Sequence, residues 1–472
     1  MKKAFKIIVF VILTSLILLA AYKVFSWKDT SGEYYSSIAQ LRATEDNSVD
    51  AVFVGSSRVY CAIAPHVFWK EAGIAAFDMS ISGMDKRSEL YYTKYFLRHQ
   101  KPKIICVDAY SFTFDKHDVE SNEYRNMLAM PTSGTQIDLV KDYNADDSKS
   151  MKEYILKWPI IHTRYKELDK GDFITEGFGL YGRGECLNET RAEYDIDFLE
   201  YADTETITPV DGKNKELIDG FIALSEKYDI PVLFYVSPAL QLESEVSVYN
   251  GIEDYVKGYE NISFVNFNNE AKDMFEDTGN FCDAVHLSKD GAEKFSRKMM
   301  EYLSNMVEFT DRRGTPGYDL WEMDALYYDL KETDNRIKKM IDSGTDAYGL
   351  IEEAVNNDYL TYIVSLDGHY YNYDYCYEEI LEVIGASWEE AESGGTWIGH
   401  GGECVKVADR DSKKPVFYDL DRYNAVKIDK NEDDDVPSVS INGTGCQQID
   451  SGVNVVVWDS INKEIVGVLG WN

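Results

Sequence analysis

Between residues 50 and 306, short runs of apolar residues alternate with longer amphipathic stretches. The runs AVFVG (51–55), KIICVDAY (103–110) and IPVLFYVSP (230–238) show little polar alternation, as strands buried on both faces require. Helical periodicity lies between them, as in KNKELIDGFIALSEKY (213–228). Because a strand–helix–strand order produces parallel pairing with right-handed crossovers, this alternation predicts an open α/β domain.

Further runs extend the pattern to the end of this domain. IAAFDMSISG (74–83) and ISFVNFN (262–268) predict two more strands, and 287–306 predicts a closing helix with Ser288 as its N-cap. Residues 111–212 interrupt the alternation before the helix that leads to the fourth strand. Because a long segment inside a compact domain usually has a function or a structure of its own, we expect an inserted cap over the sheet's edge.

The first residues combine positive charge with a long apolar run. Three lysines precede an uncharged stretch over 7–22, which is marginal for a membrane span at ~1.5 Å rise per residue but is extended by the apolar positions up to 27. A cleaved signal peptide is the alternative, because two alanines occupy positions 20 and 21. We favour an uncleaved signal anchor over 1–28 and a linker over 29–49, which place the bulk of the chain outside the cytoplasm.

After about residue 310 the composition changes. TDRRGTPGYDLW is rich in glycine, proline and charge, so 307–335 is predicted to be a linker. Beyond it, helical and strand-like segments lead to GVNVVVWDSINKEIVGVLGW, whose pattern is typical of a hairpin that turns at DSINKE. Residues 336–472 therefore predict a second, smaller α+β domain.

Charge and cysteine usage exclude several classes of protein. The chain has 83 acidic and 48 basic residues, and the resulting net charge of −35 repels phosphate backbones, so no nucleic-acid partner is expected. The seven cysteines are scattered without a C-x-x-C pair, so they predict neither a zinc site nor a disulfide framework. The sequence predicts no metal and no cofactor.

Reactive residues follow the ends of the predicted strands, where open parallel sheets bind their ligands. Ser56 and Ser57 come directly after the first strand, and Gly83 ends the second. Beyond the last strand, GNFCDAVHLSKDG places Asp283 three residues before His286. A short turn brings such a carboxylate to the imidazole, which can then take the proton of a serine hydroxyl. The alternative is structural: serines often cap helices, glycines often form tight turns, and an aspartate and a histidine often share a turn.

Together, Gly-Ser-Ser, the later glycine and Asp-x-x-His resemble the conserved blocks of the SGNH/GDSL hydrolase superfamily. The resemblance covers about 50–306 and implies a flavodoxin-like parallel sheet of SGNH type. It implies that Ser57 is the nucleophile and that its amide and Gly83 form the oxyanion hole. It also implies that His286 is the base and that Asp283 orients it.

The chain departs from the family pattern in two places. The first block reads GSS, as in membrane-anchored relatives that act on cell-surface polymers, and the third block lacks its asparagine donor. Asp108 lies in that block, and an ionised carboxylate cannot donate a hydrogen bond. Losing one such donor lowers the rate by about 10²–10³ unless Tyr110, Ser111 or a backbone amide replaces it. Arg58, Asp108 and Tyr110 are the weaker candidates for substrate binding.

The resemblance implies a membrane-anchored, extracytoplasmic serine esterase or O-acyltransferase of the bacterial cell surface. Its substrate would be an acylated carbohydrate or another ester, and a membrane-bound O-acyltransferase is an expected partner. The alternative is a non-catalytic carbohydrate-binding protein with a vestigial site. The 34 tyrosines suit either sugar stacking or half-buried packing. The C-terminal region resembles, with its halves in swapped order, the interleukin-like EMT inducer domain, which is associated with binding.

Overall fold

The computed structural model describes residues 2–26, 36–114, 120–146, 154–155, 157–166, 168, 182–192, 204–275, 278–368, 376–430, 436–446 and 448–471. The chain divides into two compact units, an N-terminal unit of residues Met1–Ala325 and a C-terminal unit of residues Leu326–Asn472. Each unit is described by itself.

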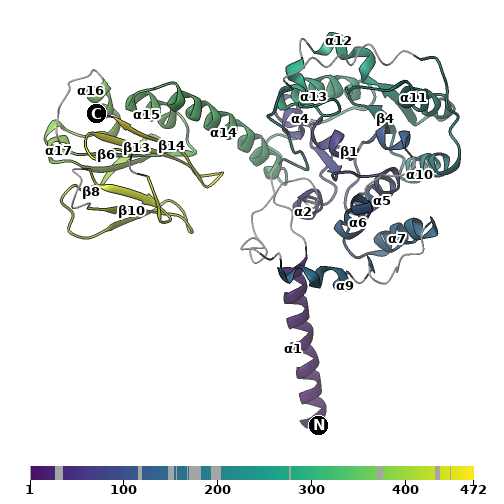
Figure 1. Ribbon diagram of the computed structural model, residues 1–472, viewed down its shortest axis with the longest axis horizontal. Helices are drawn as coiled ribbons and strands as arrows, with labels where there is room; N and C mark the ends of the chain where they lie inside the picture. The colour runs from purple at the N-terminus through teal and green to yellow at the C-terminus, as the bar shows by residue number, and fades with distance from the viewer. Residues whose placement is uncertain are drawn as a thin grey trace. The chain divides into compact units, whose positions relative to one another are not determined.

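A five-stranded parallel sheet forms the centre of the N-terminal unit (Figure 1). Its strands are β1 (Ala51–Gly55), β2 (Ala76–Ser80), β3 (Ile104–Asp108), β4 (Val232–Val236) and β5 (Ile262–Asn266). The spatial order is β2-β1-β3-β4-β5, which is one of the two common doubly wound orders. All residues of the first four strands are buried, so the prediction of a parallel sheet covered on both faces is confirmed.

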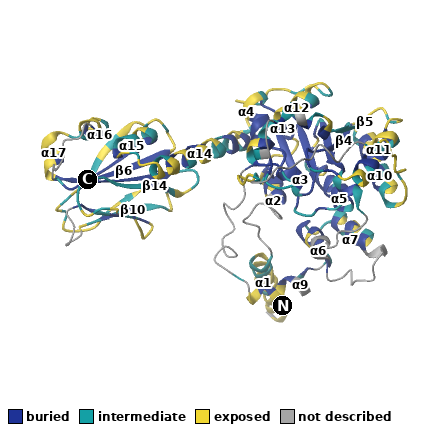
Figure 2. Cartoon of the chain, turned by 45° about the horizontal axis from the view of Figure 1, so that its top comes forward, coloured by how far each residue is buried: buried dark blue, intermediate teal, exposed yellow. Residues whose placement is uncertain are grey.

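Helices cover the two faces of this sheet because successive strand residues point to opposite sides. Val52 and Val54 belong to a core shared with α5 (Lys86–Phe96), α10 (Gly212–Tyr228) and α11 (Glu243–Val256). Phe53 faces the other core, to which α4 (Pro65–Ala72) and α13 (Lys289–Ser304) contribute. Buried residues on both sides of this sheet are coloured dark blue in Figure 2. Ser288 is the N-cap of α13, as predicted, and its hydroxyl accepts from the amide of Gly291.

Short elements complete the unit. They are α3 (Ser57–Tyr60), η1 (Ala109–Thr113), η4 (Phe267–Glu270), α12 (Ala271–Met274) and η5 (Thr278–Asn280). A further helix, α2 (Ser36–Ala43), lies within the predicted linker 29–49. That part of the linker prediction is wrong, because Ile38 and Leu41 are buried in the core beside β1. The rest of the predicted linker up to residue 35, with Trp27 and Lys28, lies outside the described residues.

The described parts of the insert 111–212 are packed onto the sheet domain. Its helices are α6 (Glu120–Ala129), α7 (Gly134–Asp146), α9 (Trp158–Ile161) and η2 (His162–Lys166). Leu139 and Val140 of α7 join the same core as α5. The stretch 182–192 begins with a turn beside the edge strand β2, where the amide of Asp78 donates to the carbonyl of Arg183 at 2.7 Å, and it ends where the amide of Ala192 donates to the carbonyl of Phe281 at 2.7 Å. The remainder of the predicted cap lies outside the described residues.

The helix α1 (Lys2–Phe25) precedes the sheet domain. The most apolar 18 residues of its segment Lys3–Phe25 have a mean hydropathy of 2.6, and by length and composition the segment is apolar enough to cross a membrane, a test that signal sequences pass as well. None of its most apolar window is buried inside the protein. At ~1.5 Å per residue these 23 residues reach about 35 Å, compared with a hydrocarbon core of about 30 Å.

The C-terminal unit contains two antiparallel sheets. One has the order β14-β13-β6-β7-β8 and the other β12-β11-β10-β9. The strands are β6 (Leu360–Leu366), β7 (Gly395–His400), β8 (Glu403–Asp409), β9 (Val416–Asp419), β10 (Ala425–Asp429), β11 (Ser438–Ile441), β12 (Thr444–Gly445), β13 (Val453–Asp459) and β14 (Glu464–Trp471). The helices α15 (Ala347–Val355), α16 (Cys376–Ile384) and α17 (Trp388–Ser393) accompany them. The predicted hairpin is present as β13 and β14.

The second linker prediction, 307–335, is wrong over its second half. Helix α14 (Asp319–Asp342) begins in this segment and continues to residue 342. Trp321 and Ala325 are buried in the core that contains β1, and Leu330 and Ile337 are buried in the core that contains β6. Within each pair, the spacing of four or seven residues keeps the two side chains on one helix face. The Gly-Pro signal that precedes Asp319 led the prediction to extend the linker too far.

Candidate active site

Ser57 lies at the carboxyl end of the central strand β1, in the first turn of α3. Ser56 is the N-cap of this turn, and its hydroxyl accepts weakly from the amide of Arg58 at 3.5 Å. Gly55 is required before it, because a Cβ there would lie 2.5 Å from Val59 and 2.9 Å from Asp108. The sharp strand-to-helix turn leaves Ser57 partly exposed between two buried neighbours.

Asp283 and His286 share a closed turn just before α13. Phe281 and Leu287 form an isolated antiparallel bridge, and the amide of Cys282 donates to the carbonyl of His286 at 3.1 Å. Within this turn, one carboxylate oxygen of Asp283 accepts from the amides of Val285 at 2.8 Å and of His286 at 2.9 Å. The carboxylate is therefore fixed by the backbone next to the imidazole that it faces.

The structure brings Ser57, His286 and Asp283 into one hydrogen-bonded chain. His286 Nε2 lies 2.8 Å from Ser57 Oγ, although the two residues are 229 positions apart in the sequence. His286 Nδ1 lies 2.8 Å from Asp283 Oδ2 and 3.0 Å from Oδ1. The side chains of His286 and Asp283 are 24% and 48% exposed, so solvent reaches the site. This arrangement of nucleophile, base and orienting carboxylate is the one that acyl-transfer catalysis uses.

The electrostatics of the turn keep Asp283 ionised. Burial by itself would raise the pKa of its carboxyl, but the hydrogen bond from His286 and those from the two amides outweigh burial and lower the pKa. An ionised Asp283 holds a proton on Nδ1, which leaves Nε2 free to accept the Ser57 proton.

Two backbone amides are placed to receive a developing negative charge. Among the described residues, neither the amide of Ser57 nor that of Gly83 donates a hydrogen bond. Gly83 follows β2, whose last residue Ser80 is paired with Gly55 of β1. Its φ of 64° lies in the left-handed region that favours glycine. The two amides therefore follow neighbouring strands, β1 and β2, and an oxyanion hole formed by them is what the resemblance implies.

Asn126 of α6 holds the Gly83 loop from inside. Its side-chain Nδ2 donates to the Gly83 carbonyl at 3.2 Å, and the residue is fully buried. Its own carbonyl accepts from the Tyr92 hydroxyl at 2.8 Å, which ties α6 to α5. Asn126 is thus a positioning residue that the sequence analysis missed. It lies in the insert, where no strand end or motif distinguishes it.

Arg58 and Asp108 are buried behind Ser57, with exposed fractions of 2% and 1%. Arg58 Nη2 donates to the carbonyl of Ser237 at 2.7 Å and to its hydroxyl at 3.3 Å, and the guanidinium lies 4.4 Å from the centre of the Tyr110 ring. In this geometry Arg58 and Asp108 are therefore not placed for direct contact with substrate, which differs from the expectation. Tyr110 is partly exposed and remains a candidate for such a contact.

The buried charges of Arg58 and Asp108 stabilise each other. Burial would lower the pKa of Arg58, but the negative charge of Asp108 is the main influence that raises it. Burial raises the pKa of Asp108, and Arg58 and the Tyr110 amide oppose that rise. Ser237, which accepts from Arg58, directly follows β4. The search for reactive residues directly after predicted strands, which selected Ser57, would have found Ser237 as well.

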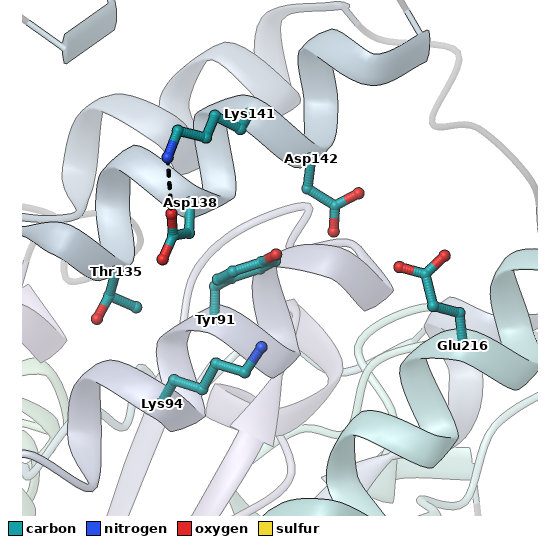
Figure 3. Close-up of a pocket in the computed structure, with 7 residues that line it drawn as sticks. All are labelled: Tyr91, Lys94, Thr135, Asp138, Lys141, Asp142 and Glu216. Atoms are coloured by element: carbon teal, nitrogen blue, oxygen red, sulfur yellow. Dashed lines mark hydrogen bonds and ion pairs between the residues drawn. The ribbon is translucent and has the colours of Figure 1, made fainter.

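An open polar pocket of about 430 Å³ lies elsewhere, between α5, α7 and α10 (Figure 3). It is lined by Tyr91, Lys94, Thr135, Asp138, Lys141, Asp142 and Glu216. The Lys94 ammonium lies 4.3 Å from the centre of the Tyr91 ring, and burial lowers its pKa. The pocket's described lining includes no histidine, no cysteine and none of Ser57, Asp283 and His286.

Metal chemistry has no visible ligand set in the described part of the chain. No group of three or more His, Cys, Asp or Glu side chains is arranged to hold an ion there. All seven cysteines are free thiols.

No protein-family model matches this chain, and no curated protein matches its sequence. The fold and the site together define a doubly wound α/β protein in which Ser57, at the end of β1, contacts His286, and His286 contacts Asp283, in the turn before α13.

Proposed function

We propose that this protein is a membrane-anchored serine esterase or O-acyltransferase of SGNH type, acting outside the cytoplasm on acyl esters of a cell-surface polysaccharide. The observation that carries the proposal is the contact of His286 with both Ser57 and Asp283, each at 2.8 Å. The strand order and the positions of these residues in the chain support the resemblance to the SGNH/GDSL superfamily. The substrate class comes from that resemblance alone.

In the first half of the reaction, Ser57 Oγ attacks the acyl carbonyl while His286 Nε2 accepts its proton. The carbonyl oxygen gains the negative charge, and the amides of Ser57 and Gly83 stabilise it. Asp283 stabilises the imidazolium formed in this step. The C–O bond to the leaving alcohol then breaks, His286 returns the proton to that alcohol, and the acyl group remains on Ser57 as an ester.

In the second half, an acceptor hydroxyl attacks the acyl-serine and gives its proton to His286. Water as acceptor yields a free acid, and a sugar hydroxyl yields a new ester. The exposed fractions of His286 and Asp283 favour an acceptor that approaches from solvent. The resemblance to anchored relatives that acylate polymers makes transfer the preferred outcome.

Fluorophosphonate labelling tests the nucleophile. The full chain is expected to be modified stoichiometrically at Ser57, and Ser57→Ala and His286→Ala should abolish the adduct. Ser56→Ala is the matched control, because Ser56 is adjacent but buried and makes only a weak cap; this variant should still be labelled. Absence of labelling in the folded protein would instead favour a carbohydrate-binding protein, which the missing third-block asparagine also favours.

A further inference from the structure

The end of α1 is fixed against the short helices α9 and η2. Arg164 of η2 donates through Nη1 to the carbonyls of Phe25 at 3.0 Å and of Ser26 at 2.8 Å. The Phe25 ring meets the Trp158 ring of α9 edge-on at 6.0 Å. The last carbonyls of a helix lack partners within the helix, and a cation at that end is favourable. The position at which α1 ends is therefore tied to residues 158–166, as Figure 1 also shows.

The same short helices are held to the rest of the N-terminal unit by Lys157. This side chain is 5% exposed, and its ammonium donates to the carbonyls of Leu128, in the last turn of α6, and Met130, directly after that helix. Burial, with a smaller contribution from Arg42, lowers its pKa to about 8. Residues 157–166 thus link the apolar helix rigidly to the insert that carries Asn126.

The outer surface of η2 is aromatic and cationic. Tyr165 is 61% exposed, and the ammonium of Lys166 lies 5.5 Å from the centre of its ring. His162 beside it is also exposed. Exposed tyrosines and snorkelling lysines are typical of the interface between the hydrocarbon core and water. On a chain of net charge −35, Lys166 adds one exposed positive charge at this surface.

We propose that Trp158, His162, Tyr165 and Lys166 form a second membrane contact, which rests on the lipid headgroups where α1 leaves the hydrocarbon core. If 3–25 fills that core, the carbonyls of Phe25 and Ser26 lie at its boundary. Arg164, which donates to both carbonyls, and Trp158, whose ring packs on Phe25, then lie there too, and Tyr165 and Lys166 directly follow Arg164 in the chain. The partner is a bilayer with anionic phospholipids, because Lys166 adds positive charge at its surface. The inference rests on the membrane anchor in the proposed function, and it adds a fixed orientation of the sheet domain over the bilayer.

Photo-crosslinking to lipid tests this contact on the full chain in vesicles of phosphatidylglycerol and phosphatidylcholine. Tyr165→p-benzoylphenylalanine is compared with the same change at Tyr423, a tyrosine of the C-terminal unit that is 76% exposed. We expect at least about five-fold more lipid adduct at position 165, as interfacial tyrosines predict. Adding Lys166→Glu should lower that adduct in anionic vesicles but not in pure phosphatidylcholine. Equal adducts at 165 and 423 would overturn the proposal.

Two measurements on the same samples separate this inference from the proposed function. Resistance to carbonate extraction reports the anchor, and fluorophosphonate labelling of Ser57 reports the chemistry. A chain that resists extraction and is labelled at Ser57, yet gives no excess adduct at 165, would overturn the second contact alone. A chain that carbonate extracts would overturn the anchor and the second contact together.

Discussion

The two units of this protein use strand direction differently. In the N-terminal unit all five strands run parallel, so their carboxyl ends meet at one edge and collect Ser57, Gly83, Asp108 and Ser237. In the C-terminal unit neighbouring strands run antiparallel, and no single edge collects the ends of its strands. Its His400 bonds to Thr361 and to the Leu360 carbonyl, which are neighbours on β6. A parallel sheet concentrates side chains from distant segments, and an antiparallel one distributes them.

The test with the largest expected effect replaces Ser57 or His286 in the N-terminal unit and His400 in the C-terminal unit. His286→Ala or Ser57→Ala should lower kcat for hydrolysis of p-nitrophenyl acetate by about 10⁴-fold or more, because triad members act as a unit. His400→Ala, the matched change in the C-terminal unit, should leave kcat within about two-fold. Steady-state kinetics on folded variants measure both. A comparable loss from His400→Ala would show that the two units share the chemistry.

A second test concerns pH and His66 of the N-terminal unit. Burial would lower the pKa of His66, but the charge and hydrogen bonds of Glu185, 3.0 Å away, and of Glu293 raise it to about 9. Since the folded pKa exceeds the unfolded value of 6.5, the stabilisation is complete below pH 6.5 and is lost as pH rises through about 9.

We expect this loss to be about 3 kcal/mol in the wild type, by linkage, and to be absent in His66→Gln. Urea unfolding at pH 6 and at pH 9.5 measures this loss in the free energy of unfolding. Hydrogen exchange in peptides from β1 is the readout for the N-terminal unit. An alkaline loss that is equal in His66→Gln would assign the effect to other groups.

The third test changes a buried amide in each unit. Asn126→Asp should lower kcat by about 10- to 30-fold with little change in KM, because a carboxylate cannot donate to the Gly83 carbonyl and the oxyanion loop moves. Asn454→Asp makes the same change at a buried asparagine of the C-terminal unit, which donates to the Ile449 carbonyl. It should lower the stability of its own unit and leave kcat unchanged.

Asn126→Ser keeps a hydroxyl donor and provides the rescue. It should recover part of the kcat lost in Asn126→Asp at equal Tm. If Asn126→Asp and Asn126→Ser lowered kcat only in proportion to their loss of folded protein, Asn126 would have a structural role alone.

The smallest effect is expected at Asp334 in the C-terminal unit. Burial raises the pKa of this carboxyl to about 7, and the nearby charge of Asp459 adds to the rise. Because the folded pKa exceeds the unfolded 3.8, the stabilisation from the protonated form is present below pH 3.8 and is lost as pH rises through about 7.

Asp334→Asn should therefore stabilise the C-terminal unit at pH 8, since it removes a buried charge that faces Asp459. Hydrogen exchange in β13 measures the gain, with β1 as the internal reference. A loss of protection in β13 at pH 8 would show that the ionised pair is favourable.

The sequence predicted the parts of the fold that repeat a simple pattern. The five strands of the N-terminal unit were placed because each is a short apolar run, and Ser57, Asp283 and His286 were selected because they follow strand ends. Helices α2 and α14 were missed because their stabilisation comes from contacts with distant segments, such as Trp321 Nε1 donating to the Ala76 carbonyl. Asn126 was missed for the same reason, since its role depends on the fold of the insert. Arg58 was expected to face substrate, and only its three-dimensional surroundings show that it is buried.

The 229-residue separation of Ser57 and His286 has a consequence for synthesis. At roughly 5–20 residues per second, a ribosome needs on the order of 10 to 50 s to reach the base after it has made the nucleophile. During that interval the hydroxyl has no proton acceptor, so a nascent chain cannot capture an acyl group. In the proposed reaction, turnover therefore begins only after the final segment of the sheet domain has been made and folded.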